Sequence, residues 1–155
     1  MAKLKMIVCT GENNLIGDKV PSGNGLLWHS MEELQYYKSK TIGNVVLFGE
    51  NTAKYVPINL MKKNRDVVVL TLDIKLEDIL KQYPDRDIFV CGGYTIYKYY
   101  LENYELDEIY ISRLKPHVEV ASASNPLYFP DVEKYGYKLV SETEYYDFTA
   151  QIYKK

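Results

Sequence analysis

The sequence predicts an α/β fold: a single domain with a mainly parallel central sheet, flanked by helices and extended by a C-terminal antiparallel hairpin. Two observations predict it. Short apolar runs rich in Val and Ile alternate with helical patterns along most of the chain, and the C-terminal residues change to alternating apolar and polar side chains. The length of 155 residues suits one domain, so we assign residues 1–155 to it.

Five apolar runs predict strands covered on both faces, because each is short, does not alternate, and is bounded by Gly, Asn, Asp or Thr. These runs are residues 6–9, 44–48, 67–71, 87–91 and 108–112. Near the C-terminus, residues 137–144 and 148–153 do alternate, which predicts a hairpin with its turn at residues 145–147.

Helical spacing occurs at residues 30–39, 76–82 and 94–102. In the first of these stretches, Met31, Leu34 and Tyr37 recur at three-residue steps. Strands and helices that alternate at this spacing are typical of a parallel sheet with helices on its faces.

The first helix also contains a candidate acid. Ser30 precedes Glu33 by the spacing of a capping box, so Glu33 could simply cap the helix. Alternatively, Glu33 points inward on the face of Tyr37, where a buried carboxylate needs a partner. The residues alone favour the cap, with Glu32 as a solvated neighbour.

Charge and cysteine content exclude several classes of function. Lys and Arg total 19 and Asp and Glu 21, a net charge of −2, which leaves no basic excess for nucleic acid or an anionic membrane. Cys9 and Cys91 lie inside apolar runs, so we expect no disulfide framework, no zinc site and no other metal. The N-terminal residues contain no signal-peptide core or membrane span, which predicts a cytoplasmic protein.

Two long connections interrupt the regular pattern. Residues 11–25, rich in Gly and Asn, form either a variable surface loop or a flap beyond the carboxyl ends of the strands, where such sheets bind ligands. Residues 116–130 are polar and small, and an ordinary surface connection accounts for them.

Two strand ends carry glycines that suit phosphate binding. Gly92-Gly93 leads directly into a helix, and Gly49 precedes a short helix start that contains Thr52. A plain tight turn is the simpler interpretation of each, but glycines also let a ligand approach the main chain and the helix N–H groups. Two such turns indicate a ligand with two ends, such as a dinucleotide, although Gly-x-Gly-x-x-Gly is absent from the sequence.

Taken in order, these segments resemble the dihydrofolate reductase family over nearly the whole chain. The matching segments are Ile16-Gly17, Trp28 with Glu33-Leu34 and Tyr37-Lys38, Gly49 with Thr52, Arg65 before residues 67–71, residues 90–93 with Ile96-Tyr97, residues 109–112 and residues 129–131. The resemblance implies the α/β fold of this family. It also implies that the protein is an enzyme that transfers hydride from NADPH to C6 of 7,8-dihydrofolate. It also implies small-molecule partners, namely dihydrofolate and antifolate inhibitors, and a monomer.

On the substrate side, the resemblance assigns Glu33 to N3 and the 2-amino group of the pterin ring, through a paired, charge-assisted hydrogen bond. Ser112 supports this acid, with a serine satisfied by the backbone as the alternative. Trp28 belongs to the loop that closes over the rings and excludes water. The implied catalytic residues are thus Glu33, Trp28 and Ser112. The implied substrate-binding residues are Ile7 and Cys91 through their carbonyls, Val8, Glu33, Leu34, Tyr37, Ser112, and Arg65, which holds the α-carboxylate of the glutamate tail or else is a solvated charge.

On the cofactor side, the implied residues are Cys9, Ile16, Gly17, Gly49, Glu50, Asn51, Thr52, Leu70, Thr71, Cys91, Gly92, Gly93, Tyr94, Thr95, Ile96 and Tyr97. The sequence departs from the family here. Glu50 stands where members often have an Arg for the 2′-phosphate of NADPH, so either other residues hold the phosphate or the preference over NADH is reduced. Tyr94 follows Gly92-Gly93 where family members often have a third Gly, and Leu27 precedes the Trp where they usually have Pro. The loop at residues 11–25 is longer than the short form of the family, because of residues 21–25.

Two other functions fit parts of the sequence. The pyrimidine reductase of riboflavin biosynthesis shares the fold, but Glu33 and Arg65 are not expected there. A nucleotide- or folate-binding module without turnover is supported by Glu50 and the altered loop, and opposed by the intact spacing from Trp28 to Glu33.

Overall fold

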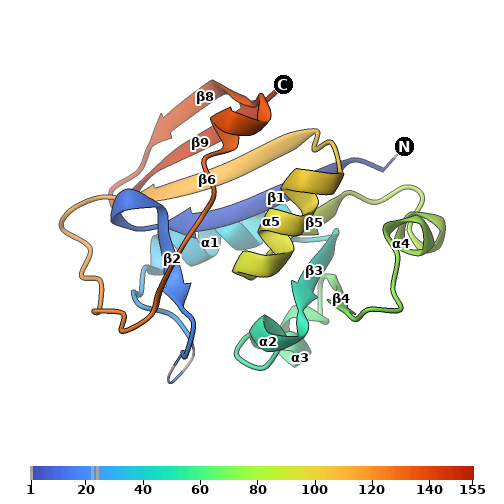
Figure 1. Cartoon of the computed structure of the whole chain (residues 1–155), viewed down its shortest axis with the longest axis horizontal. Helices are drawn as coiled ribbons and strands as arrows, with labels where there is room; N and C mark the ends of the chain where they lie inside the picture. The colour runs from blue at the N-terminus through green and yellow to red at the C-terminus, as the bar shows by residue number, and fades with distance from the viewer. Residues whose placement is uncertain (1, 22, 24) are drawn as a thin grey trace.

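The computed structural model describes residues 2–21, 23 and 25–155, and it contains a seven-stranded sheet in the order β4-β3-β5-β1-β6-β9-β8 (Figure 1). The first five strands of this order run parallel, and β9 and β8 add an antiparallel hairpin. The predicted fold class is confirmed. Within the described residues, no helix combines the length and apolar character that a bilayer crossing requires.

The predicted strands and helices are all present, with ends shifted by a few residues. The strands of the main sheet are β1 (Leu4–Thr10), β3 (Val45–Gly49), β4 (Asp66–Leu70), β5 (Ile88–Val90), β6 (Glu108–Leu114), β8 (Lys138–Glu144) and β9 (Phe148–Lys154). The α-helices are α1 (Met31–Thr41), α2 (Glu50–Ala53), α3 (Ile58–Met61), α4 (Leu76–Gln82) and α5 (Tyr94–Asn103), and the 3-10 helices are η1 (Glu12–Asn14) and η2 (Val132–Tyr135).

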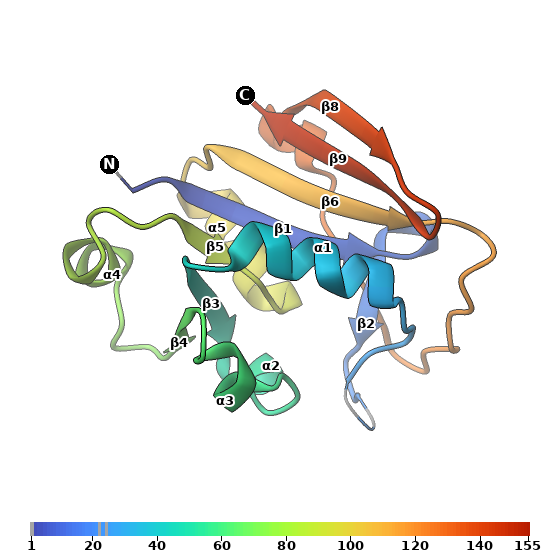
Figure 2. The same cartoon turned by 180° about the vertical axis from the view of Figure 1, so that it is seen from behind.

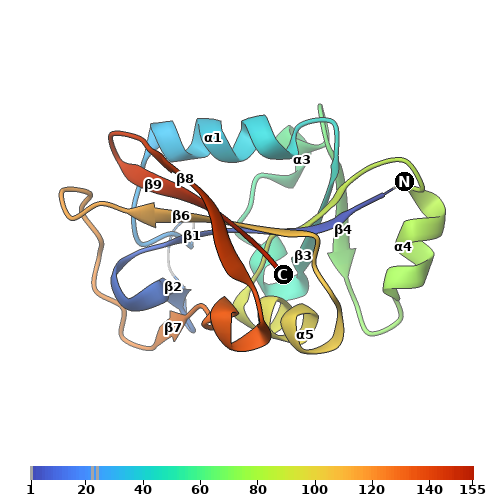
Figure 3. The ribbon, with the colours of Figure 1, turned by 90° about the horizontal axis from the view of Figure 1, so that it is seen from above.

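Helices α1 and α5 cover opposite faces of the sheet (Figures 2 and 3). Side chains of a strand alternate between the two faces, so Met6 and Val8 of β1 join the core that contains Tyr97 of α5. Ile7, between them, joins the core on the other face, against which Tyr37 of α1 packs. This two-sided cover explains why the parallel strands read as continuous apolar runs.

The buried face of α1 differs from the one that its apolar spacing suggests. Met31 is 57% exposed and Leu34 is 41% exposed, whereas Glu33, Tyr36 and Thr41 are buried. Tyr36 packs edge-on against Tyr145 and Phe148 of the hairpin, with ring centroids 5.6 and 5.3 Å away. The aromatic contacts therefore determine how the helix is rotated on the sheet.

The hairpin turn is hydrogen-bonded to the first turn of α1. The Ser30 hydroxyl accepts a bond from the backbone N–H of Glu33 at 3.2 Å and donates one to Asp147 Oδ2 at 2.6 Å. Glu32 Oε1 accepts a bond from the N–H of Asp147 at 2.8 Å. The expectation that Glu32 is merely solvated is therefore wrong, because residues 145–147 provide its partner.

The hairpin forms where the alternation predicts it, but β8 buries neither of its faces. Every residue of β8 is exposed, including Leu139 at 46% and Val140 at 55%. The register with β9 also shifts between Leu139 and Ser141. β8 is the last strand of the sheet, so alternation there does not reflect one buried face.

The two long connections form a second, small sheet that the sequence analysis missed. β2 (Leu15–Asp18) pairs antiparallel with β7 (Pro126–Tyr128). The Asp18 carboxylate accepts bonds from the N–H groups of Ser124 and Asn125 at 2.9 and 3.3 Å. A surface connection is thus an insufficient account of residues 116–130, since these segments, distant in sequence, hold each other. Of the predicted longer loop at residues 21–25, Ser22 and Asn24 lie outside the described residues.

The two glycine-containing strand ends pack directly against each other. The N–H of Gly49 donates to the carbonyl of Gly92 at 2.8 Å. A Cβ on Gly49 would lie 2.8 Å from Ile96 Cγ1, and a Cβ on Gly93 would lie 2.6 Å from Thr52 Oγ1. The two turns therefore form one joined surface.

We expect Gly93→Ala to destabilise the protein by about 1–3 kcal/mol, because the new methyl group overlaps Thr52 Oγ1. Thr52→Ala in the same chain should recover most of that loss. Urea unfolding of the two single variants and the double variant measures this coupling.

Gly17→Ala is the matched control, since a Cβ at Gly17 meets nothing within 4 Å. Equal losses for Gly93→Ala with and without Thr52→Ala would mean that the Thr52 side chain does not require the glycine.

Candidate active site

The centre of the candidate site is the carboxyl group of Glu33, in the first turn of α1. Glu33 is only 8% exposed, and Ser112 Oγ donates a hydrogen bond to its Oε2 at 3.0 Å. Ser112, on β6, is itself 1% exposed. The structure thus brings together two of the predicted catalytic residues, and the Ser112 hydroxyl is bonded to the acid.

Burial raises the pKa of Glu33 to about 7, because the ionised form loses contact with water. Hydrogen bonds from Ser112 and Cys9 act in the opposite direction and limit the rise. The group can therefore be charged or neutral near neutral pH. In a capping box the Glu33 carboxyl would also accept a bond from the backbone N–H of Ser30. The hydrogen bonds of the described residues do not include that bond, because the carboxyl accepts from Ser112 instead.

Cys9 contributes a side chain that sequence reasoning missed, since it was assigned only to cofactor binding. The parallel register of β1 and β6 pairs Cys9 with Ser112, so both lie beside Glu33. Burial, together with the charge of Glu33, raises the pKa of the Cys9 thiol well above its usual value, so this thiol stays protonated.

The carbonyls expected to contact the pterin lie nearby on β1 and at the end of β5. The Ile7 carbonyl accepts a hydrogen bond from the Tyr97 hydroxyl at 2.8 Å, which leaves its second lone pair for a ligand. The Cys91 thiol bonds to the Phe89 carbonyl at 3.5 Å, and burial raises its pKa to about 12. Cys91 is therefore a neutral packing group. Val8, next to Ile7, faces the opposite core.

Arg65 lies at the other end of α1 and is not a solvated charge. It is 8% exposed, donates from Nη1 to Thr41 Oγ1 at 3.2 Å, and donates from Nε to Asn64 Oδ1 at 2.9 Å. Its guanidinium carbon is 5.9 Å from the ring centroid of Tyr37. Glu33 and Thr41 are eight residues apart on one helix, so the acidic and basic ends are separated by about 12 Å.

Most of the predicted cofactor residues lie at the carboxyl ends of β3, β4 and β5, while Cys9 is on β1. The register pairs Gly49 with Leu70, so Glu50 and Thr71 leave the sheet at the same edge. Both of these side chains are exposed, as are Asn51 and Thr95. By contrast, Ile96 packs against Gly49, and Tyr97 lies in the core. Ile16 and Gly17 are on β2, with Ile16 against the core and Gly17 buried; Tyr94 is half-buried at the first position of α5.

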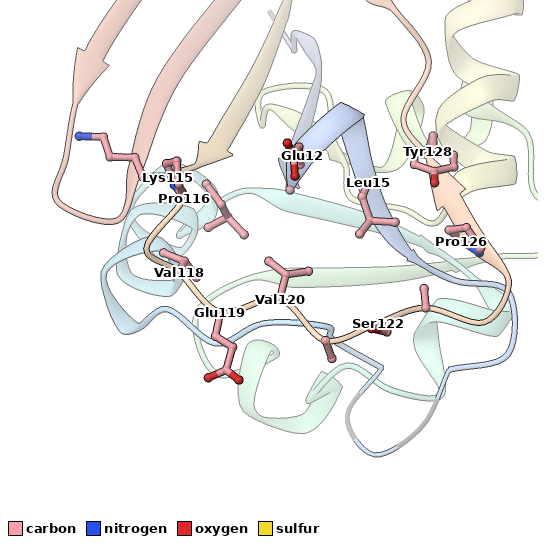
Figure 4. Close-up of a pocket in the computed structure, with 14 residues that line it drawn as sticks. Glu12, Leu15, Lys115, Pro116, Val118, Glu119, Val120, Ser122, Pro126 and Tyr128 are labelled. Atoms are coloured by element: carbon pink, nitrogen blue, oxygen red, sulfur yellow. The ribbon is translucent and has the colours of Figure 1, made fainter.

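A separate hollow of about 720 Å³ lies between residues 11–15 and residues 114–128 (Figure 4). Leu15, Val118 and Val120 give it an apolar lining. Its described lining includes neither Glu33 nor the glycine turns, so it is not the site outlined above.

Comparison with known proteins supports one family. The model of the dihydrofolate reductase family matches residues 3–155. Dihydrofolate reductase of Buchnera aphidicola is 25% identical over 145 residues, covering 86% of this chain and 83% of that protein. That of Bacillus subtilis is 25% identical over 169 residues, covering 98% and 94%.

A solved structure has the same fold. Dihydrofolate reductase from Enterococcus faecalis, complexed with NADP(H) and RAB-propyl, superposes with a TM-score of 0.70 at 20% identity, over 98% of this chain and 95% of that one. Because the family model spans nearly the whole sequence, the chain belongs to the dihydrofolate reductase family.

Proposed function

We propose that this chain reduces 7,8-dihydrofolate at C6 to tetrahydrofolate, with NADPH as the hydride source. The observation that carries the proposal is the buried Glu33 carboxyl, hydrogen-bonded to Ser112 at one end of α1, with a buried Arg65 at the other end. An elongated ligand with an amidine at one end and a carboxylate at the other fits this charge arrangement. The proposal includes a monomer that acts in the cytoplasm and binds antifolates at the same residues.

Glu33 orients the substrate. Its two oxygens bind N3 and the 2-amino group of the pterin, and its negative charge favours protonation at N5, which makes C6 a better hydride acceptor. The proton reaches N5 through water, so Glu33 stabilises the charged ring rather than donating to N5 directly. Ser112 holds the carboxyl in place, and the Ile7 carbonyl offers a free lone pair to the pterin.

Arg65 binds the glutamate tail. The two oxygens that hold its guanidinium, from Thr41 and Asn64, are neutral, so they leave its positive charge available to a ligand carboxylate. This pair of a buried acid and a held arginine distinguishes the folate substrate from that of the riboflavin-pathway reductase.

The glycine turns fit the pyrophosphate of the dinucleotide. Gly93 precedes α5, whose first turn has free N–H groups, and a side chain at Gly93 would fill space that Thr52 borders. Glu50 does not suit a 2′-phosphate, since two negative charges repel. We therefore assign the contacts to the 2′-phosphate to Asn51, Thr52 and Thr71, and we expect only a moderate preference for NADPH over NADH.

The direct test follows the absorbance of the reduced nicotinamide with dihydrofolate present, in parallel reactions with NADPH and NADH. Turnover that requires dihydrofolate is expected, faster with NADPH. A folded protein that binds NADPH but reduces dihydrofolate with neither cofactor would overturn the proposal.

We expect Glu33→Gln to lower the rate of hydride transfer at pH 7 by about 100-fold or more, because the amide carries no charge to pair with the protonated ring. Single-turnover absorbance measures the rate. The dissociation constant for NADPH should stay unchanged, which separates loss of chemistry from loss of fold. A rate near that of the unmodified protein would remove Glu33 from its proposed role.

The same substitution should raise stability in alkaline solution. Burial raises the pKa of Glu33 in the folded protein from 4.5 to about 7, so the folded state favours the neutral carboxyl. The stability that this carboxyl contributes is therefore complete below pH 4.5 and is lost as the pH rises through 7. We expect Glu33→Gln to increase the free energy of unfolding at pH 8 by on the order of 3 kcal/mol, and to change it little at pH 4. Urea unfolding at both pH values measures the difference; an equal gain at both would point to a cause other than ionisation.

For the cofactor, Glu50→Arg should strengthen NADPH binding relative to NADH by about tenfold or more, since an arginine replaces a repelling charge with an attracting one. Fluorescence titration gives both dissociation constants without turnover. Glu142→Arg on β8 is the control, because it makes the same change of charge at the opposite edge of the sheet. An unchanged ratio in Glu50→Arg would place Glu50 away from the phosphate.

A further inference from the structure

Arg113 on β6 connects four elements through its guanidinium. Nε donates to Gln151 Oε1 at 2.5 Å, and Nη1 donates to Asn14 Oδ1 at 2.7 Å. Two longer bonds, each of 3.5 Å, run from Nη1 to Thr10 Oγ1 and from Nη2 to the Tyr153 hydroxyl. These partners belong to β9, η1 and β1, so one side chain joins the sheet to the connection that follows β1.

The charge of Arg113 has no acidic partner in the part of the chain that the structure describes. Its acceptors are amide and hydroxyl oxygens, and the ion pairs of the described residues do not include it. The guanidinium is half-buried and permanently charged. Because a charged donor forms a stronger hydrogen bond than a neutral one, the short bond to Asn14 restrains η1.

The backbone of η1 needs such a restraint. Asn13 and Asn14 have φ angles of 57° and 67°, in the left-handed region that residues other than glycine rarely adopt. The carbonyl of Asn14 accepts a bond from the N–H of Phe129 at 2.7 Å, and the N–H of Gly11 donates to the carbonyl of Leu15 at 2.8 Å. Bonds to the backbone and to the Asn14 side chain therefore hold the turn together.

This turn determines where β2 begins. β2 starts at Leu15, directly after Asn14, and contains Ile16 and Gly17, two residues that the family resemblance assigns to the cofactor. Ile16 packs against the core on the α5 side of the sheet, and Gly17 is buried. A different conformation at Asn14 would change the direction in which the chain enters β2.

We propose that Arg113 is a positioning residue, which holds Asn14 in its left-handed conformation and thereby keeps β2 in place for the nicotinamide cofactor. The inference rests on the proposed function, because NADPH is the ligand assigned to Ile16 and Gly17. Arg113 acts through Asn14 and takes no part in the chemical step.

Amide hydrogen exchange of the ligand-free full chain tests the restraint. Arg113→Met removes every donor and keeps an apolar side chain, whereas Asn14→Gly removes the acceptor and still allows the left-handed backbone. In both variants, peptides that cover residues 11–19 should exchange about tenfold faster, the factor expected for one hydrogen bond from a charged group. Peptides from β3 report global stability, and where Arg113→Met changes them as well, Asn14→Gly decides.

Asn13→Gly is the matched control. It makes the same replacement at the neighbouring left-handed residue, whose side chain takes part in none of the hydrogen bonds found among the described residues. Exchange at residues 11–19 should then change by no more than about threefold. Asn14→Asp keeps the acceptor and gives Arg113 an ionic partner, so exchange should be equal or slower. The double variant of Arg113→Met and Asn14→Gly should exchange no faster than either single variant.

Single-turnover hydride transfer tests the consequence for the reaction. At saturating NADPH and dihydrofolate, the rate should fall by about tenfold in Arg113→Met and Asn14→Gly, and should be retained in Asn13→Gly and Asn14→Asp. The dissociation constant for dihydrofolate should stay within about twofold, because its assigned residues lie outside the turn. Unchanged exchange in Asn14→Gly, losses that add up in the double variant, or a rate that does not follow the exchange would overturn the inference.

Failure of the proposed function gives a different result. A protein that binds NADPH but does not reduce dihydrofolate would remove the assigned reaction and leave this inference open to test by exchange and by cofactor affinity. The dissociation constant for NADPH should rise by about fivefold in Arg113→Met and Asn14→Gly, because less of the protein holds β2 in place. An affinity that stays constant while exchange quickens would show that Arg113 does not position β2 for the cofactor.

Discussion

The buried carboxyl of Glu33 is the constraint on which the rest of the site depends. A carboxylate almost removed from water is costly unless hydrogen bonds replace its hydration. Ser112 supplies such a bond from β6, and its side chain points to the α1 face of the sheet only in the observed register. A shift of one residue in this strand would turn the hydroxyl to the other face. The register of the central strands and the state of the acid are therefore determined together.

The position of α1 depends equally on the C-terminal hairpin. Tyr36 packs against Tyr145 and Phe148, and the hydroxyl of Ser30 links the helix N-terminus to Asp147. Hydrogen bonds from Ser30 and from His117 hold the pKa of Asp147 below its usual value, so this carboxyl remains an acceptor over a wide pH range. The C-terminal hairpin at the edge of the sheet thus orients α1, the helix that carries Glu33.

The two halves of the site solve different physical problems. At Glu33, burial raises the pKa to about 7, so ionisation of this carboxyl near neutral pH costs folding stability. At the cofactor end, close approach of two backbone turns leaves no space for side chains at Gly49 and Gly93. Glu50 is exposed beside these turns, and in the proposed function its charge opposes a second phosphate. Arg65 is held by Thr41 of α1, and the proposed function assigns it to an anionic tail.

The sequence by itself determined the fold class, the five parallel strands, the three main helices and the hairpin, because burial on both faces and helical spacing are local patterns. The ordered motifs also indicated the family and brought Glu33, Ser112 and Arg65 into consideration. It could not determine that Met31 and Leu34 are exposed, that β2 and β7 pair, or that β8 is uncovered, since these depend on which distant segment lies opposite. The hydrogen bond of Ser112 to Glu33 is of the same kind, because it joins β6 to α1 across 79 residues of sequence, and only the tertiary structure brings the hydroxyl and the carboxyl together.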